Sequence, residues 1–458
     1  YGYAYTNLSG AVSAGRFSVL GAASYRRSDG YRHNTDFSNY NAFVRATCDG
    51  GRAGFFDLQA GWQDRDFGSN GFYAAYNPDQ WEHTATALAS LRWLKTAGRF
   101  SLGAAASYRK NFDRYDWTRG TAMNRHNTDN AGAKLWADCD WAAGVTSAGG
   151  DWAFNHIYST NLGEKLAVPE GHYTHAKARH TGNLWLRHAK QWRRFDAAAS
   201  AGVSLTPYGT SALWSLSAGW TPAEGLHVGA GAWQSMRLPT FTDLYYTSPA
   251  QINNLDLTPE HAVTYRLGAD YLKRCWNVSA QAYYRAGRDI IDWVWREDMD
   301  GKWHSEQSSR LDTYGIELAG GYAVPEGFLR RVTLSYGYIT TDRNTDVVAK
   351  SAMDFMRHKA ALAVEVCFLR RMSLALTGSV YDRNGSYTCY PVPGDASVTE
   401  IRSYEPYFLL DGRLSWEKGA CRLYVDATNI TDARYCDIGG LRLPGFWCTG
   451  GVVLTIGR

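Results

Sequence analysis

The amino-acid sequence predicts an all-β fold, namely a transmembrane antiparallel β-barrel. Runs of about ten residues alternate apolar with polar or small side chains, as at Val332, Leu334, Tyr336 and Tyr338. This period of two is that of a strand whose two faces meet different surroundings. Short glycine-containing turns alternate with long polar loops along the whole chain. The composition agrees, because 30 tyrosines, 18 tryptophans and 46 glycines accompany only 12 prolines.

Composition and charge exclude several other classes. The formal net charge is only +4, from 48 basic and 44 acidic residues, so no strong field indicates a nucleic-acid partner. A hydrophobic content of 45% excludes a disordered chain. No uninterrupted apolar run approaches the roughly 18–20 residues of a membrane-spanning helix. The eight cysteines form no CxxC pair and no zinc-type cluster with histidine, which argues against a structural metal site.

The connections between the predicted strands differ in length on the two sides. Short turns such as 13–16, 96–99 and 417–420 alternate with long loops. The long loops lie near residues 28–38, 64–83, 113–130, 161–175, 238–259, 287–310, 342–353, 382–405 and 431–445. This asymmetry is typical of an outer-membrane barrel with periplasmic turns and extracellular loops. A soluble β-sandwich would not keep it over so many hairpins, and no blade repeat of a propeller is present.

Twenty-one alternating runs are visible as strands. They lie near residues 1–12, 17–27, 39–48, 54–63, 84–94, 100–110, 131–141, 151–159, 176–189, 194–206, 211–220, 226–236, 260–273, 276–286, 311–323, 331–341, 355–368, 372–381, 406–416, 421–429 and 446–456. Bacterial single-chain barrels have an even number of strands. We therefore expect 22 strands in the intact protein, with one strand preceding Tyr1. A barrel of this size needs an internal plug, so residues 1–458 are expected to be a barrel domain whose plug and first strand lie upstream.

Two motifs resemble a known family. Residues 237–246 read RLPTFTDLYY and residues 254–260 read NLDLTPE, which is similar to a stretch of TonB-dependent outer-membrane receptors. Residues 429–432 read NITD, and Tyr435 and a Pro-Gly pair at 444–445 follow, which resembles the final hairpin of that family. Residues 67–82 more loosely resemble the vitamin B12 receptor-like branch. The chain departs from the family pattern at Leu255, Phe446 and Arg458.

This resemblance implies an active importer in the bacterial outer membrane, in contact with its lipids. The expected ligand is a large metal chelate, with cobalamin or another corrinoid favoured over a ferric siderophore or haem. A TonB-type energy-coupling protein is the expected partner, acting through the N-terminal segment outside this chain. Alternatives are a glycan or peptide importer working with a surface lipoprotein, and a passive porin. No resident cofactor is expected, and no GxSxG, HExxH or Walker motif indicates an enzyme.

Aromatic residues in the predicted extracellular loops, with arginine and asparagine neighbours, are the candidate ligand-binding residues, because such side chains stack on a flat chelate and donate hydrogen bonds at its rim. The candidates are Tyr31, Arg32, Trp81, Tyr115, Trp117, Tyr245, Tyr246, Trp293, Trp303, Tyr387 and Tyr390. The alternative for each aromatic residue is a place in the interfacial girdle or in loop packing.

Charged residues and cysteines give further expectations. Arginines such as Arg237 either hold an anionic ligand or belong to an interior ladder of ion pairs with Asp57, Glu317, Glu365 and Asp426. Cys389 and Cys436 fall in neighbouring extracellular loops and are a candidate disulfide; Cys367 and Cys421, beside successive periplasmic turns, are a weaker second pair. His172, His175 and His180 are interpreted as a loop cluster rather than a metal site.

Overall fold

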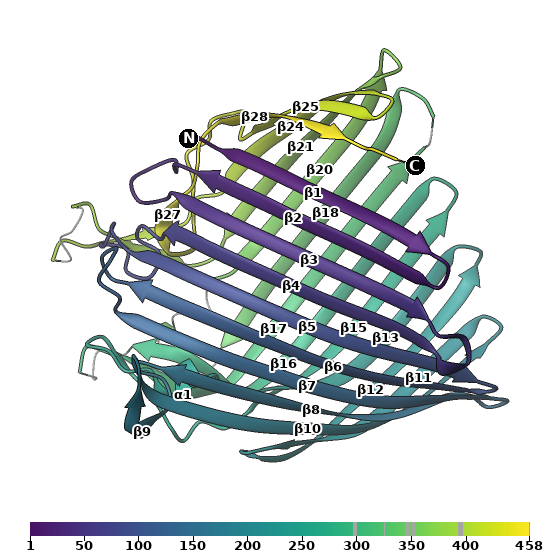
Figure 1. Cartoon of the computed structure of the whole chain (residues 1–458), viewed down its shortest axis with the longest axis horizontal. Coiled ribbons are helices and arrows are strands. Elements are labelled where there is room, and N and C mark those ends of the chain that lie inside the picture. Colours follow the sequence, from purple (N-terminus) through teal and green to yellow (C-terminus); the bar gives the residue numbers. More distant parts are fainter. Residues whose placement is uncertain (296–299, 325, 344–347, 350–353, 393–396, 458) are drawn as a thin grey trace.

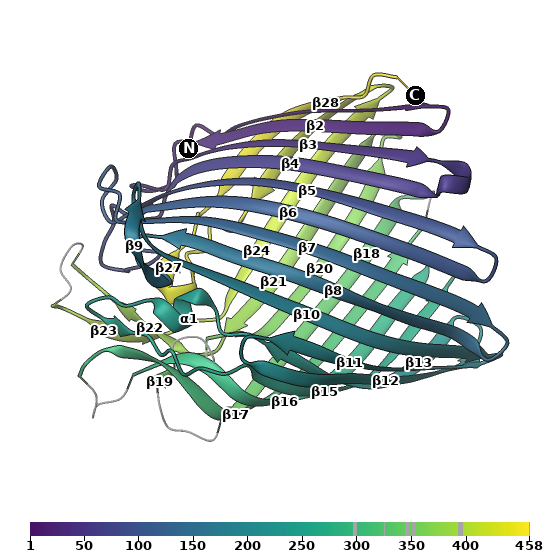
Figure 2. The ribbon, with the colours of Figure 1, turned by 60° about the horizontal axis from the view of Figure 1, so that its bottom comes forward.

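The computed structural model describes residues 1–457 except 296–299, 325, 344–347, 350–353 and 393–396. Its main feature is one sheet of 24 strands that curves into a barrel (Figures 1 and 2). Three of these strands, β9 (Glu164–Glu170), β14 (Gln251–Ile252) and β19 (Val348–Ala349), are short and lie within long loops. The remaining 21 follow one another around the wall, and each pairs antiparallel with its neighbours.

All 21 predicted strands are confirmed. Their bounds are β1 Ala4–Ala14, β2 Phe17–Ser28, β3 Phe37–Asp49, β4 Phe55–Gly68, β5 Trp81–Ala97, β6 Phe100–Asp116, β7 Asn124–Trp141, β8 Gly144–Ser159, β10 Tyr173–Trp192, β11 Phe195–Thr206, β12 Gly209–Ala223, β13 Leu226–Arg237, β15 Glu260–Lys273, β16 Trp276–Trp295, β17 Trp303–Ala323, β18 Leu329–Arg343, β20 Met356–Phe368, β21 Met372–Arg383, β24 Tyr407–Lys418, β25 Cys421–Thr428 and β28 Trp447–Leu454.

The strands are longer at the loop end than the alternation predicts. β6 and β7 extend into the predicted loop 113–130, and β16 and β17 extend into the predicted loop 287–310. Both strands of each pair are hydrogen-bonded over these extensions, for example Asp113 opposite His126. Sequence periodicity misses such segments because their two faces do not differ: both carry polar side chains in the β6 and β7 extensions, and both carry buried apolar side chains, such as Ile290 and Ile291, in the β16 extension. The predicted loop 342–353 lies largely outside the described residues.

Short elements order the long loops. They are the five-residue helix α1 (Phe241–Tyr245), the hairpin of β22 (Ser386–Cys389) with β23 (Glu400–Ser403), the pair β26 (Cys436–Asp437) and β27 (Leu441–Arg442), and the 3-10 turn η2 (Ile438–Gly440). A further 3-10 turn, η1 (Gly51–Ala53), lies at the turn end. In Figures 1 and 2, α1, β9 and β27 gather at one end of the barrel, and the tight turns lie at the other.

The two faces of the wall differ in chemistry. Leu8, Val12 and Trp62 lie on the outer face and are strongly exposed. The alternate rows point into the lumen and are joined by polar contacts. Arg45 pairs with Asp57 at 2.7 Å, and Gln281 donates a hydrogen bond to Glu317. Arg413 binds both oxygens of Asp426, with 2.7 Å between Nη2 and Oδ2. The predicted interior ion pairs are therefore present at Asp57 and Asp426, whereas Glu317 is bound by a neutral glutamine.

β1 and β28 are the two edges of the sheet. β1 pairs with β2 and β28 pairs with β25, and no ladder joins β1 to β28 in the described part of the chain. Both strands run from the loop end toward the turn end (Figure 1). At the loop end the rings of Tyr1 and Tyr3 each lie 5.4 Å from the ring of Trp447. The edges therefore touch at one end through aromatic side chains.

No helix among the described residues is both long enough and apolar enough to cross a membrane.

Candidate ligand-binding mouth

Three loops meet in an aromatic group at the loop end, which we call the mouth cluster: Tyr73, Tyr76, Tyr115, Trp117 and Tyr390. The ring of Tyr76 lies 5.8 Å from Trp117 and 5.4 Å from Tyr390. The ring of Tyr73 lies 4.9 Å from Tyr115. The structure thus brings together three predicted residues, Tyr115, Trp117 and Tyr390. It adds Tyr73 and Tyr76, which lie in the predicted loop 64–83 but were not selected from the sequence.

Hydrogen bonds fix the mouth cluster to the wall. Tyr73 donates its hydroxyl hydrogen to Glu82, which stands opposite Tyr115 in the β5–β6 ladder. The Asn77 side-chain amide donates to the carbonyl of Trp117 at 2.8 Å, which ties the 69–80 loop to the 117–123 loop. Rings held in this way lose little further side-chain entropy when a flat ligand packs against them.

The phenols near the mouth cluster stay protonated. Burial raises the pKa of Tyr73, with a further rise from the hydrogen bond to Glu82. Burial also raises the pKa of Tyr390 and of Tyr246, and Tyr246 lies within electrostatic range of Tyr115. These side chains therefore offer apolar faces and neutral hydrogen-bond donors rather than negative charge. Such surroundings suit a planar ligand with acceptor groups at its edge.

A second aromatic group, which we call the edge cluster, consists of Tyr31, Tyr387, Tyr404 and Tyr435, of which Tyr31 and Tyr435 lie within electrostatic range of each other. Tyr387 and Tyr404 have ring centroids 5.1 Å apart. Burial raises the pKa of Tyr404 to about 12, and its hydroxyl accepts a hydrogen bond from the Gly439 amide at 2.9 Å. Tyr31 donates to the Arg442 carbonyl at 2.6 Å. Tyr31 and Tyr387 were predicted as site residues; Tyr404 and Tyr435 were not.

Arg32 lies beside the edge cluster. Its guanidinium is 5.7 Å from the Tyr31 ring, and its Nη2 donates to the Asn70 carbonyl at 2.9 Å. Its Nε is buried and has no hydrogen-bond partner in the described part of the protein. Arg32 therefore places a positive charge next to an aromatic face, which fits an anionic group on a ligand.

Two predicted residues are buried. Trp81 is 9% exposed and lies between the guanidinium groups of Arg114 and Arg119, at 5.4 and 5.7 Å from its ring. The strand alternation places Trp81 on the outer face, on the same side of β5 as His83 and Trp93. Trp293 is 8% exposed. We therefore leave both out of the proposed site, since neither presents a free ring.

Tyr245 is the last residue of α1, and Trp303 is the first residue of β17. The Tyr245 ring packs against the small core of Leu244, Leu257 and Ile291. Its further neighbours are the Lys177 ammonium at 5.8 Å and the Phe241 ring at 6.5 Å. The Trp303 amide donates to Ala250 at 2.9 Å, where β14 joins β17. Among the described residues, no ring contact joins Tyr245 or Trp303 to either aromatic cluster.

Side-chain contacts within residues 237–260 hold together the two ends of the loop that contains α1. Arg237 binds both carboxylate oxygens of Glu260, with 2.8 and 2.6 Å between donor and acceptor atoms, and lies 3.6 Å from Asp243. Thr240 and Asp243 form a capping box at the start of α1, each side chain accepting the backbone N–H of the other. Because the Arg237 charge is already paired twice, we assign it to the interior ladder rather than to ligand binding.

The predicted disulfides are not formed. All eight cysteines carry free thiols, including Cys389 and Cys436. Cys436 is nevertheless within electrostatic range of Cys389, and burial raises the pKa of its thiol. Cys367 on β20 and Cys421 on β25 are separated by β21 and β24. Three inter-strand steps amount to about 14 Å, which is beyond the reach of a disulfide, so that second pair is wrong.

The predicted loop cluster of histidines is wrong, because His175 and His180 lie on β10 and point to opposite faces. His175 stands opposite Ser159 on the lumen row of β10, whereas His180 faces Phe154 on the outer row, with ring centroids 4.8 Å apart. Among the described residues, the one group with metal-ligand geometry is Asp64, Asp66 and His83. It lies outside the mouth.

A hollow of about 930 Å³ also lies away from the mouth. Its walls include Trp192, Leu216, Tyr265 and Leu267, all exposed residues of the outer rows. Alanines of β11, β12 and β13 form its floor. An apolar groove on this face is a surface for lipid tails rather than a ligand pocket.

Comparison with known proteins assigns the family. Residues 4–430 match the family model described as "TonB dependent receptor-like, beta-barrel". The chain therefore belongs to the TonB-dependent receptor barrel family. It is a β-barrel of the bacterial outer membrane, where that family resides. In that membrane the tight turns face the periplasm and the long loops face outward.

Individual relatives are more distant. The vitamin B12 transporter BtuB of Photobacterium profundum is 28% identical over 134 residues, covering 29% of this chain and 21% of that protein. The match thus spans about a fifth of that relative's length.

Solved structures share the fold at low identity. The siderophore receptor PirA from Pseudomonas aeruginosa superposes with a TM-score of 0.72 at 12% identity, over 99% of this chain and 77% of its own. The copper transporter OprC superposes with a TM-score of 0.78 at 14% identity, over 98% of this chain and 77% of its own. The FrpB iron transporter from Neisseria meningitidis superposes with a TM-score of 0.77 at 11% identity, over 98% of this chain and 79% of its own.

Proposed function

We propose that this receptor imports a large metal chelate that binds at the mouth cluster, with a corrinoid favoured over a ferric siderophore or haem. The observation that carries the proposal is the contact of Tyr76 with both Trp117 and Tyr390. These three rings come from three different loops, so they form one aromatic surface only in the folded protein. A flat or rounded ligand of chelate size can contact all three loops at once.

The chemistry of the surrounding groups supports this ligand class. The neutral phenols of Tyr73, Tyr246 and Tyr390 can donate to carbonyl or amide oxygens at the rim of a chelate. The Arg32 guanidinium, beside the Tyr31 ring, can pair with a carboxylate or phosphate group. The preference for a corrinoid rests on the vitamin B12 transporter as a partial relative and on residues 67–82, which contribute Tyr73 and Tyr76 to the cluster.

The proposal includes a gate and an energy source. β1 and β28 run in the same direction and each has one paired edge. One antiparallel strand between them would pair with both, which would give the 22 strands expected for the intact barrel. We place this strand, the plug and the contact with a TonB-type coupling protein in sequence outside residues 1–458. No catalytic step forms part of the proposal.

Equilibrium binding to the full-length receptor in detergent tests the ligand class. Cyanocobalamin, haemin and a ferric siderophore are each titrated against wild type, Tyr76→Ala and the control Tyr314→Ala. Tyr314 is a matched control because it also stacks on tyrosine, at 5.0 Å from Tyr284, but on the outer wall. We expect cyanocobalamin binding, weakened about tenfold or more by Tyr76→Ala and unchanged by Tyr314→Ala.

The other outcomes have definite meanings. If the receptor binds only haemin or only the siderophore, that compound replaces the corrinoid as the proposed ligand, and the mouth cluster remains the proposed binding site. Equal binding by Tyr76→Ala and wild type would remove the mouth cluster from the proposal. Uptake of small solutes into liposomes without a coupling protein would favour the passive porin, and capture of oligosaccharide or peptide alone would favour that importer class.

A further inference from the structure

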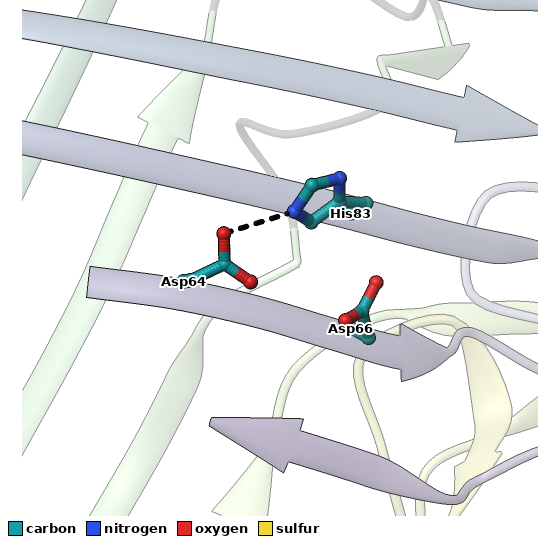
Figure 3. A group of neighbouring side chains, drawn as sticks. All are labelled: Asp64, Asp66 and His83. Carbon is teal, nitrogen blue, oxygen red and sulfur yellow. Dashed lines mark hydrogen bonds and ion pairs between the residues drawn. The ribbon is translucent and has the colours of Figure 1, made fainter. Parts of the chain in front are cut away.

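The outer wall carries a group of metal-ligating side chains that the import proposal does not use. Asp64 and Asp66 lie on β4, two residues apart, so both point to the same face as the exposed Trp62. His83 lies on β5, directly opposite Asp66 in the ladder. Figure 3 shows the imidazole above the two carboxylates, joined to Asp64 by a hydrogen bond. The three side chains thus converge from two adjacent strands.

The spacing of these three side chains fits a single ion. His83 Nε2 and Asp64 Oδ2 are 3.2 Å apart, and one ligand atom from each of the three residues lies within 4.8 Å of the others. Ligands bound at about 2.1 Å to one ion are separated by about 3–4 Å. Small rotations of the two carboxylates therefore suffice to place all three atoms in one coordination sphere.

The charges near the group also favour a cation. Asp64 has His83 as its partner, but the Asp66 carboxylate makes no hydrogen bond or ion pair with any other described side chain. The Arg114 guanidinium, opposite His83 on β6, is engaged elsewhere, because its two hydrogen bonds, 2.9 Å each, go to Asp116. Arg65, between the two aspartates, points to the other face and binds Gln63. Two carboxylates thus share one neutralising partner.

The surroundings define the environment of the group. The Tyr40 phenol lies within electrostatic range of both aspartates and stacks on Tyr25 at 4.6 Å. These tyrosines and Trp62 are outward-facing aromatic residues near the loop end of β2, β3 and β4. The His83 ring packs against Phe112 at 5.5 Å. All three ligand residues are half-buried, so an ion there would be partly shielded from water on the barrel side and open outward.

We propose that Asp64, Asp66 and His83 form a binding site for a divalent transition-metal cation on the outer wall. One imidazole nitrogen and two carboxylate oxygens suit Zn²⁺ and neighbouring ions better than Ca²⁺ or Mg²⁺, which prefer oxygen ligands alone. The remaining coordination positions face outward and take water. The ion would join β4 to β5 beyond their backbone ladder, near the loop whose residues Tyr73 and Tyr76 line the mouth.

Zn²⁺ binding to the full chain in detergent tests this site. The protein carries no affinity tag, its thiols are alkylated, and it is dialysed against chelator before calorimetric titration with Zn²⁺. We expect one site that Asp66→Asn weakens at least tenfold, with a similar loss for His83→Gln. Asp66→Asn is the decisive variant because that carboxylate has no described partner to lose. Co²⁺ absorption provides a second readout, since its visible bands report inner-sphere ligands.

The control is the pair His33–Asp79, which has the same two side-chain types at 2.6 Å but no third ligand among the described residues. Asp79→Asn should leave the Zn²⁺ titration unchanged. Heat-modified migration in gels verifies that each variant is folded. The proposal is overturned if the wild-type chain binds no Zn²⁺, if Asp66→Asn binds as tightly as wild type, or if Asp79→Asn removes the site.

Discussion

Arg237 and Glu260 face each other across β13 and β15 and form a two-pronged ion pair, with 2.6 Å between Nη2 and Oε1. The Glu260 side chain is almost fully buried and also accepts the backbone N–H of Ile291 at 2.7 Å. One carboxylate therefore fixes the end of β13, the start of β15 and the irregular part of β16. The loop that carries α1, Tyr245 and Tyr246 begins and ends at this pair.

Removal of this carboxylate should destabilise the barrel. In Glu260→Ala the buried Ile291 amide loses its acceptor and the half-exposed Arg237 guanidinium loses its two-pronged partner, which together cost about 2 kcal/mol. Urea unfolding of the refolded barrel in detergent measures the loss. The control is Glu417→Ala, whose exposed pair with Arg422 should contribute less than about 0.5 kcal/mol. Equal stability of the two variants would contradict a stabilising role of the Glu260 carboxylate.

Trp81 and Trp117 should behave oppositely on substitution. Trp81→Ala removes a buried ring and is expected to lower stability by about 3 kcal/mol while ligand affinity stays unchanged. Trp117→Ala removes a partly exposed mouth ring and is expected to weaken chelate binding about tenfold with little loss of stability. Denaturant unfolding and equilibrium binding on the same samples separate the two effects. A loss of binding in Trp81→Ala alone would contradict the assignment of Trp117 to ligand binding and of Trp81 to packing.

The pairing of the two edge strands, β1 and β28, predicts how fast their backbone amides exchange hydrogen with solvent. Half of the amides of β1 and β28 have no strand partner in the described part of residues 1–458, since β1 pairs only with β2 and β28 only with β25. In this chain alone those amides should exchange faster than amides of β6, which pairs on both sides. A longer chain that supplies the proposed strand should slow the exchange. Equal rates in both chains would exclude that strand.

The Cys436 thiol should react slowly near neutral pH. Burial raises its pKa, so at a given pH the folded protein holds less of the reactive thiolate than the unfolded chain does. Alkylation at pH 8, followed by mass spectrometry of the Cys436 peptide, is expected to be slower in the folded than in the SDS-unfolded protein. Raising the pH should narrow this difference, because the folded thiol then ionises as well. Equal rates at pH 8 would contradict a buried thiol.

Cys389 and Cys436 remain a predicted disulfide that an oxidant can form. The two thiols lie within electrostatic range, and Tyr387, two residues before Cys389, packs beside Gly440 of η2. Diamide, which takes up the two thiol hydrogens and leaves a disulfide, should link the 384–406 loop to the 429–446 loop. Peptide mapping under non-reducing conditions detects the link. Cys367 and Cys421 serve as the control pair, which should stay unlinked.

The candidate site was predictable only in part. Tyr115, Trp117 and Tyr390 could be selected because aromatic residues in long loops are visible in the sequence. The common contact of Trp117 and Tyr390 with Tyr76 could not be predicted, since Tyr76 and Tyr390 lie more than 300 positions apart in the chain. Trp81 is the opposite case, because it was selected from the sequence but does not belong to the proposed site. It carries the same local signal as Trp117, but the alternation of β5 turns its ring to the outer face, between two arginines.

The barrel, its 21 visible strands and the side of each loop could be predicted from the sequence, because pairing between strands that are neighbours in sequence needs only local alternation and turn length. The interior ladder was predictable too, since polar side chains on the inner rows mainly find their partners in one another. Three features required the folded chain: which loop residues meet at the mouth, the full engagement of Arg237 by Glu260, and the convergence of Asp64, Asp66 and His83. Those contacts depend on where curved strands bring distant residues, and the period of two carries no such information.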